Sequence, residues 1–274
     1  MIGKTVGKYL FQEELGGGST AYVYKGLDQE LNRVVAIKML HTYLIKNSTI
    51  VERFRRESKV IQRLKHPHII EFIDYHEDED NFLYVMEYLK TYTLEDVLEK
   101  KKRLPKKLAI PILSELCDAL SYAHALDIVH RDVKPSNLFV ARNRGLILSD
   151  FGLAKPMGDA PITAVGSKMM GTPHFMAPEQ VFGGETDART DIYQTGLIVF
   201  KTLTGDLPFN DKSHFKAIML RTQRGPMYQE QHSPFLSPRL RAIIDKACKI
   251  QPEQRYQTAE ELKDALDSAR FDED

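Results

Sequence analysis

β-Prone hydrophobic residues recur along the first forty positions of the chain and predict several strands. Gly, Asp and Asn, which favour turns, separate these residues over Val6–Met39. A helical period replaces this pattern over 50–65, where five residues share one face: Val51, Phe54, Ser58, Ile61 and Leu64. Pro67 disfavours helix in the residue before it, so the helix should end there. Two more strands are predicted at Ile69–Tyr75 and Phe82–Met86.

Helical patterns dominate from Thr93 onward, with one short pair of strands at Leu138–Val140 and Leu146–Leu148. The composition changes near Glu87–Tyr92, from β-rich before this segment to helix-rich after it. We therefore expect an α+β fold with a small β-rich lobe, a larger helical lobe and a ligand-binding cleft where they join.

Charge and cysteine content narrow the class of protein. The 274 residues include 38 Lys and Arg and 38 Asp and Glu, so no dedicated nucleic-acid surface and no nucleic-acid partner are expected. An apolar run long enough for a membrane span is absent from the sequence, and Met1–Phe11 lacks the apolar region of a signal peptide. Cys117 and Cys248 fall in helical patterns, which favours buried, reduced thiols and a cytoplasmic setting.

Two neighbouring segments carry the chemistry of phosphoryl transfer. His130–Asn137 reads His-Arg-Asp-Val-Lys-Pro-Ser-Asn, and Asp150-Phe151-Gly152 follows it closely. The first segment offers a carboxylate that can accept a hydroxyl proton, a Lys that can neutralise a phosphate and an amide that can hold a metal. The second segment adds a metal-binding carboxylate on a turn that contains Gly.

These segments resemble the protein kinase family, and further family motifs recur in order from Leu15 to Arg255. The sequences of these motifs are most similar to those of the eukaryotic-type Ser/Thr kinases of bacteria. The resemblance implies a bilobal α+β fold and one kinase domain over residues 1–274. Its N-lobe would cover about 1–87, its hinge about 87–92 and its C-lobe about 93–274.

The segment Leu15–Val23 resembles the kinase glycine-rich loop, with Ala21 in the place of the usual third glycine. Its strand–turn–strand setting differs from that of the Walker and Rossmann loops, which open a helix. A glycine run between strands is equally compatible with a plain hairpin turn. Lys38 closes the sequence Val-Ala-Ile-Lys and resembles the Lys that binds the nucleotide phosphates, with Glu57 as its ion-pair partner.

The resemblance also implies an adenine site. Met86 would be the gatekeeper, the backbone of Glu87–Leu89 would bind adenine, and plain core packing is an equally good interpretation of the residues around the ring. The nucleotide-binding set comprises Leu15, Gly16, Gly17, Gly18, Ser19, Val23, Ala36, Lys38, Met86, Glu87, Leu89, Asn137, Phe139 and Asp150.

On the catalytic side, Asp132 would accept the proton of a Ser or Thr hydroxyl that attacks the γ-phosphate of ATP. Lys134 would offset charge on the transferred group, and Lys38 and Glu57 complete the predicted catalytic set. Asn137 and Asp150 would hold Mg²⁺, or Mn²⁺ in its place, because hard cations prefer oxygen ligands. In the family, a Lys at position 134 marks the Ser/Thr branch.

Residues 150–179 resemble the activation segment of kinases, with Thr163, Ser167 and Thr172 as candidate phosphorylation sites. A phosphate there could pair with Arg131 and Lys155. The Thr172 hydroxyl would bridge Asp132 and Lys134. Autophosphorylation and a transient self-dimer are therefore expected.

Other residues are expected to be structural supports. The resemblance implies that His130 is a packed core imidazole and that Glu179 and Arg255 form a buried ion pair, and Asp191 is expected to brace the catalytic loop. Pro111 interrupts the helical pattern of Leu108–Ala125, so that helix should start late or kink.

The sequence thus predicts an ATP- and Mg²⁺-dependent protein Ser/Thr kinase that acts on protein substrates. A catalytically silent kinase-like module that binds nucleotide or partners is the alternative. A small-molecule kinase is disfavoured because Ala177-Pro178-Glu179 resembles a peptide-docking loop. The chain is also compatible with the kinase part of a longer receptor.

Overall fold

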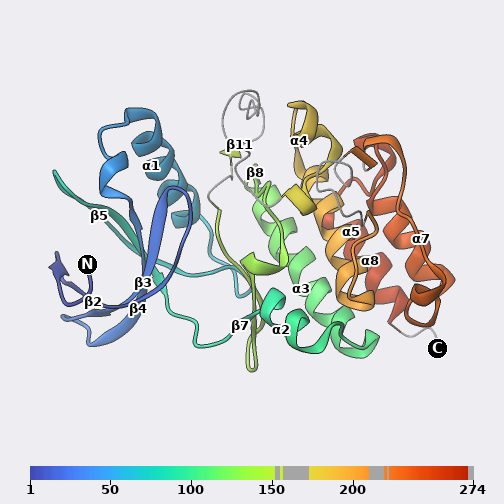
Figure 1. Cartoon of the computed structure of the whole chain (residues 1–274), viewed down its shortest axis with the longest axis horizontal. Coiled ribbons are helices and arrows are strands. Elements are labelled where there is room, and N and C mark those ends of the chain that lie inside the picture. The colour runs from blue at the N-terminus through green and yellow to red at the C-terminus, as the bar shows by residue number, and fades with distance from the viewer. Residues whose placement is uncertain (152–154, 157–172, 210–218, 221, 271–274) are drawn as a thin grey trace. The chain divides into compact units, whose positions relative to one another are not determined.

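The N-terminal strands form a six-stranded antiparallel sheet in the computed structural model, which describes residues 1–151, 155–156, 173–209, 219–220 and 222–270 (Figure 1). The strands follow the order β1-β2-β3-β4-β6-β5. Their bounds are β1 Thr5–Val6, β2 Tyr9–Gly17, β3 Ala21–Asp28, β4 Arg33–Leu40, β5 Phe72–Glu77 and β6 Phe82–Glu87. The strands predicted for this region are confirmed.

Alternate residues of β4 serve the two faces of this sheet. Val35, Ile37 and Met39 point into a hydrophobic cluster with residues of β2 and β6. The opposite face packs on α1 (Ser48–Gln62), whose Val51 and Phe54 join Tyr84 in a second cluster. Asn47 caps this helix by accepting a hydrogen bond from the Ile50 N–H.

The predicted span of α1 was displaced by a few residues. The helix begins at Ser48 because the Asn47 cap stands earlier than the apolar period, and it ends at Gln62. Leu64 is buried, but it lies beyond the helix in the turn that leads to Pro67.

Helices outnumber strands in the described residues that follow Thr93. They are α2 Leu94–Lys101, α3 Lys106–Ala125, α4 Pro178–Phe182, α5 Ala188–Thr204, α7 Pro238–Ala247 and α8 Ala259–Ala269. Short 3₁₀ turns occur across the chain at η1 Thr42–Leu44, η2 Pro135–Asn137, η3 Pro173–Phe175, η4 Glu230–Phe235 and η5 Pro252–Gln254. Helix α3 contacts both α5 and α8, and these three helices form the centre of the helical part (Figure 1).

Small strand ladders accompany these helices. One ladder has the order β10-β9-β7, built from β7 Tyr92–Thr93, β9 Leu138–Ala141 and β10 Gly145–Leu148. The other pairs β8 (Ile128–Val129) with β11 (Lys155–Pro156). The strand pair predicted near residues 138 and 146 is confirmed, with Leu138 opposite Leu148.

Pro111 was expected to make its helix start late or kink, and the late start does not occur. Helix α3 begins at Lys106, with Pro105 at the N-cap position, so Pro111 lies inside it and causes no late start. A proline removes the hydrogen bond to the carbonyl four residues earlier, here that of Lys107. Since Lys107 is exposed, water can satisfy that carbonyl.

The chain divides into two compact units, Met1–Lys90 and Thr91–Asp274. The division falls inside the segment 87–92 where the composition changes. The first unit is β-rich with one long helix and the second is mainly helical, which agrees with the predicted α+β kinase fold.

Candidate active site

Lys38 and Glu57 meet in the first unit. Lys38 lies on β4 with its Nζ atom 2.7 Å from Oε1 of Glu57, which α1 presents. The two side chains are only 14% and 9% exposed, so water screens the pair weakly. The ion pair that the sequence predicted therefore exists in the structure.

Tyr84 is a third member of this group, and the sequence analysis missed it. Its hydroxyl donates to the same Oε1 atom of Glu57 at 2.6 Å, and the residue is 1% exposed. Tyr84 stands directly opposite Lys38 in the β4–β6 ladder. The sequence could have indicated Tyr84, because it stands two residues before Met86 and therefore on the same face of a predicted strand.

The glycine-rich segment is a tight β2–β3 hairpin. Gly17 pairs with Tyr22, and the Gly18 N–H donates to the Ala21 carbonyl at 2.9 Å. A side chain at Gly17 would meet the Tyr22 ring at 2.6 Å, whereas a side chain at Gly16 or Gly18 would meet no atom within 4 Å in the described part of the chain. Packing therefore explains the glycine only at position 17.

Four of the predicted adenine-site residues of the first unit lie on the neighbouring strands β3, β4 and β6. Ala36 lies opposite Met86, and Val23 lies opposite Lys38. The Glu87 side chain is buried and accepts from the Glu71 N–H at 2.9 Å. Leu15 is exposed and Leu89 half-buried in the same unit, while Phe139 is half-buried on β9 of the second unit.

Asp132, Lys134 and Asn137 converge on one loop of the second unit. The Lys134 Nζ atom is 2.7 Å from Oδ2 of Asp132. The Asn137 amide nitrogen donates to the Asp132 backbone carbonyl at 2.9 Å, and its distance to the Asp132 carboxylate is 3.4 Å. This amide orientation leaves the Asn137 side-chain oxygen as the atom able to accept a ligand.

Burial raises the pKa of the Asp132 carboxyl, although the neighbouring Lys134 ammonium acts in the opposite direction. The charge of Asp150 adds to the increase, so the two carboxylates interact electrostatically. Asp150 has a φ of 61° and Arg131 a φ of 66°. Left-handed backbone costs a non-glycine residue about 1–2 kcal/mol, so the surrounding contacts must hold both residues in place.

Asp191 of α5 provides one of those contacts. Its buried carboxylate accepts from the backbone N–H of His130 at 2.9 Å and of Arg131 at 2.7 Å, and the His124 ring lies 2.8 Å away. Although burial acts to raise it, these partners hold the pKa of Asp191 below its usual range. The predicted bracing role of Asp191 is confirmed.

Two glutamines that the sequence analysis missed also hold the backbone of the loop around Asp132. Gln194 accepts from the Val133 N–H at 2.8 Å and donates to the Arg131 carbonyl at 3.1 Å. Gln180 of α4 donates to the same carbonyl at 2.8 Å. Gln194 stands three residues after Asp191, a spacing that places both on one helix face and could have revealed it.

His130 is fully buried, which confirms the prediction of a packed imidazole. Its ring lies edge-on to Phe151, with 4.6 Å between the ring centres. Nδ1 accepts from the Asp132 N–H at 3.2 Å, so Nε2 is the donor to the Ser149 carbonyl at 3.0 Å. The imidazole thus links the Asp132 loop to the residue before Asp150.

Glu179 and Arg255 form the predicted buried ion pair. Both terminal nitrogens of Arg255 lie 2.8 Å from the Glu179 carboxylate oxygens. The remaining N–H groups donate to the carbonyls of Lys249, Arg189 and Ile250. All five guanidinium donors are therefore used.

The Arg131 side chain is 2% exposed and donates to the Thr186 hydroxyl at 2.6 Å and carbonyl at 3.1 Å. The candidate phosphorylation sites Thr163, Ser167 and Thr172 lie outside the described residues, as does the Lys155 side chain.

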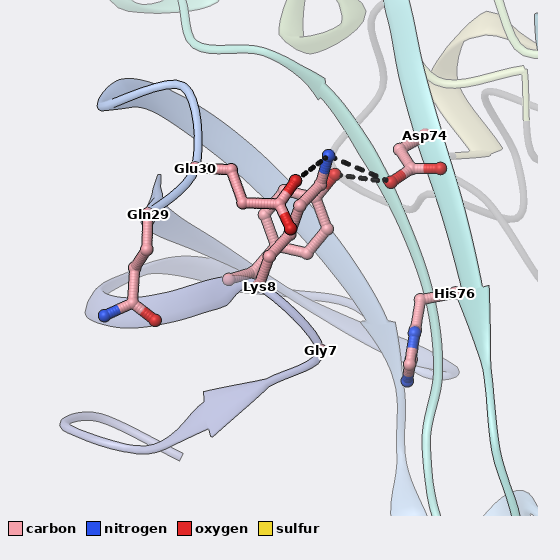
Figure 2. A pocket seen from close by; sticks show the side chains of 7 residues that line it. Gly7, Lys8, Gln29, Glu30, Asp74 and His76 are labelled. Carbon is pink, nitrogen blue, oxygen red and sulfur yellow. Dashed lines mark hydrogen bonds and ion pairs between the residues drawn. The ribbon is translucent and has the colours of Figure 1, made fainter.

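A pocket on the first unit is lined in part by one lysine and two carboxylates, unlike the residues predicted to bind the nucleotide (Figure 2). The Nζ atom of Lys8 lies 3.4 Å from Asp28, 3.5 Å from Glu30 and 3.9 Å from Asp74. Although burial acts to lower it, these carboxylates raise the pKa of Lys8. Their surplus negative charge repels phosphate, so this pocket is not the nucleotide site. It is lined by Gly7, Lys8, Tyr9, Gln29, Glu30, Asp74 and His76.

The protein kinase domain family matches residues 9–266. The chain belongs to this family. The Lys38–Glu57 pair belongs to the first unit of this domain, and the hydrogen-bonded loop around Asp132 belongs to the second.

Curated relatives agree with this assignment. A probable serine/threonine-protein kinase of Clostridium perfringens is 36% identical over 99% of this chain and 40% of its own length. The serine/threonine-protein kinase PrkC of Bacillus subtilis is 34% identical over 100% of this chain and 43% of its own length. PknB of Mycobacterium leprae, also a serine/threonine-protein kinase, is 33% identical over 93% and 42%. The chain thus spans less than half the length of these relatives.

Proposed function

We propose that this kinase domain transfers the γ-phosphate of ATP to Ser or Thr hydroxyls of proteins. The observation that carries the proposal is the pairing of the Asp132 carboxylate with the Lys134 ammonium at 2.7 Å. A proton acceptor for the protein hydroxyl and a cation for the phosphoryl group of ATP then stand side by side. The names of the curated relatives support the Ser/Thr class.

In the proposed reaction, the substrate hydroxyl oxygen forms a bond to the γ-phosphorus while the bond from that phosphorus to the bridging oxygen breaks. Asp132 takes the hydroxyl proton, and ADP carries away the bonding electron pair. Lys134 offsets the negative charge of the phosphoryl group in transit. General-base help of this type contributes about 10²–10⁴-fold in rate, and positioning supplies much of the rest.

The residues present fit Mg²⁺, with Mn²⁺ as a substitute. Asn137 has one side-chain oxygen directed away from its own hydrogen bond, and Asp150 supplies a carboxylate. No group of three His, Cys, Asp or Glu residues within the described part of the chain could hold a metal alone. Phosphate and water oxygens would therefore complete the shell, and the bound cation would neutralise the triphosphate.

We propose that the first unit binds the nucleotide. Lys38, held by Glu57, would contact the phosphates, and the loop Leu15–Ser19 would cover them. The room around Gly16 and Gly18 supports this role, since no atom of the residues that the structure describes lies within 4 Å of a side chain placed there. Val23, Ala36, Met86, Glu87 and Leu89 would form the part of the adenine site that lies on this unit.

The proposal extends to phosphorylation of the domain and to its location in the cell. Thr163, Ser167 and Thr172 stay candidate phosphorylation sites, reached by a transient self-dimer. A cytoplasmic setting is supported by Cys117 and Cys248, which lie buried as thiols. No helix in the described residues is long and apolar enough to cross a membrane.

The direct test is transfer of labelled phosphate from ATP and Mg²⁺ to a basic protein substrate. Wild type should label the substrate, and Asp132→Asn should lower the rate by about 10²–10⁴-fold. Asp150→Asn serves as the metal-site control. Equally poor transfer by wild type and Asp150→Asn would favour the silent kinase-like module. Transfer to small hydroxylated compounds in place of protein would favour a small-molecule kinase.

A further inference from the structure

His41 forms hydrogen bonds with the tip of the glycine-rich hairpin. The residue follows β4, is 5% exposed, and its Nε2 atom lies 2.9 Å from the Gly18 carbonyl oxygen. A carbonyl can only accept, so Nε2 carries the proton and donates it. The other ring nitrogen, Nδ1, is buried without a hydrogen-bond partner in the described structure.

Two tyrosines fix the orientation of this ring. The Tyr22 ring meets the His41 ring edge-on, with 4.2 Å between their centres. Tyr43 stacks on His41 at 5.2 Å with an angle of 13° between the planes. Tyr22 also lies against Gly17, whose missing side chain makes room for it. The imidazole therefore has one well-defined direction in which to donate.

The His41 backbone reaches the same hairpin. Its N–H donates to the Thr20 carbonyl at 2.9 Å. His41 thus contacts the residues on both sides of Ser19, with its ring on Gly18 and its backbone on Thr20. Within the described residues, the N–H groups of Ser19 and Thr20 donate to no protein atom.

We propose that His41 is a positioning residue for the triphosphate of ATP. By holding the Gly18 and Thr20 carbonyls, it keeps the neighbouring N–H groups of Ser19 and Thr20 available to phosphate oxygens. Backbone N–H groups in a tight turn are suited to anions because several can donate to one ligand. This inference rests on the proposed function, since it assigns a new residue to the same nucleotide site.

The role separates triphosphate binding from adenine binding. Both hydrogen bonds that His41 donates go to the hairpin tip, so its loss should weaken binding of ATP and leave binding of adenosine, which has no phosphate, unaffected. His41→Phe keeps a ring between the two tyrosines but removes the donor. His41→Gln restores a donor at similar reach, whereas the amide of His41→Asn is too short.

The experiment is equilibrium binding of MgATP and of adenosine to the whole chain, with KM for ATP measured in parallel. His41→Phe should weaken MgATP about three- to tenfold, the effect of one lost hydrogen bond, and change adenosine binding less than about twofold. His41→Gln should recover most of the loss. His76→Phe, a histidine on β5 of the same sheet, is the matched control and should bind both ligands as wild type does.

Equal weakening of MgATP and adenosine would show that His41 only supports the fold, and would overturn the proposal. Wild-type MgATP affinity in His41→Phe would overturn it as well. Should His41→Phe fail to fold, the comparison of His41→Gln with His41→Asn applies the same test. A wild type that binds MgATP but transfers no phosphate would end the proposed function and leave the binding test of His41 intact.

Discussion

Tyr84 and Lys38 share one acceptor, the Oε1 atom of Glu57, at 2.6 and 2.7 Å. The tyrosine hydroxyl therefore helps to set the position of the carboxylate that holds Lys38. This arrangement ties the ion pair to the core of the sheet, because Tyr84 is buried on the central part of β6.

Tyr84→Phe should raise KM for ATP about two- to tenfold and lower the free energy of unfolding by about 1–2 kcal/mol, because Glu57 loses a buried donor. Steady-state kinetics and urea unfolding measure the two effects. Tyr75→Phe is the matched control, since Tyr75 donates to Glu77 at an exposed site of the same sheet. Indistinguishable kinetics in the two variants would mean that Tyr84 does not position Glu57.

Asp191→Asn should lower the free energy of unfolding by about 2–4 kcal/mol at pH 7, because two backbone N–H groups lose a charged acceptor. The pKa of Asp191 in the folded protein lies below its unfolded value of 3.8. Its stabilising effect is therefore complete above the unfolded pKa and is lost as the pH falls through the folded pKa.

Urea unfolding of wild type and Asp191→Asn at pH 7, 5 and 3.5 checks this prediction. The difference between the two proteins should be the same at pH 7 and 5 and should begin to narrow only near pH 3.5. A difference that already narrows between pH 7 and 5 would contradict the assigned pKa direction.

Arg255→Met should lower the free energy of unfolding by about 3–5 kcal/mol, because it leaves the Glu179 carboxylate without its buried cation. Arg255→Lys should recover only part of this loss, since an ammonium cannot make two parallel bonds to the carboxylate. Thermal and urea unfolding are suitable measurements. Arg142→Met is the control at an exposed position and should behave like wild type within about 0.5 kcal/mol.

Cys117 and Cys248 should both resist modification in the folded protein. Cys117 is fully buried, and burial raises the pKa of its thiol far above the usual range. Cys248 is 1% exposed. A thiol-reactive dye should label neither residue rapidly under native conditions and both in urea, as mass spectrometry can establish. Fast native labelling of either residue would contradict this burial.

Sequence reasoning found the residues whose chemistry is visible in one short segment. The resemblance to the kinase family predicted the Lys38–Glu57 pair, the loop around Asp132 and the Glu179–Arg255 pair. Such groups are recognisable because phosphate and metal chemistry demands particular side chains in a fixed order.

The residues that support those groups were harder to predict. Tyr84, Gln180 and His41 act through strand register or tertiary packing, and their residue types are common in ordinary cores and turns. Their partners lie 27, 49 and 23 positions away. Of the late start or kink expected at Pro111, the late start does not occur, and Lys107, four residues before Pro111, lies exposed to water.

The Glu179–Arg255 pair also has a consequence for biosynthesis. The two residues stand 76 positions apart, so a nascent chain presents the carboxylate long before its guanidinium partner is synthesised. Until Arg255 emerges, the segment that begins α4 keeps an anion that burial would penalise. Ribosome-bound intermediates that end before Arg255 should therefore leave this segment open to proteases, and emergence of Arg255 should close it.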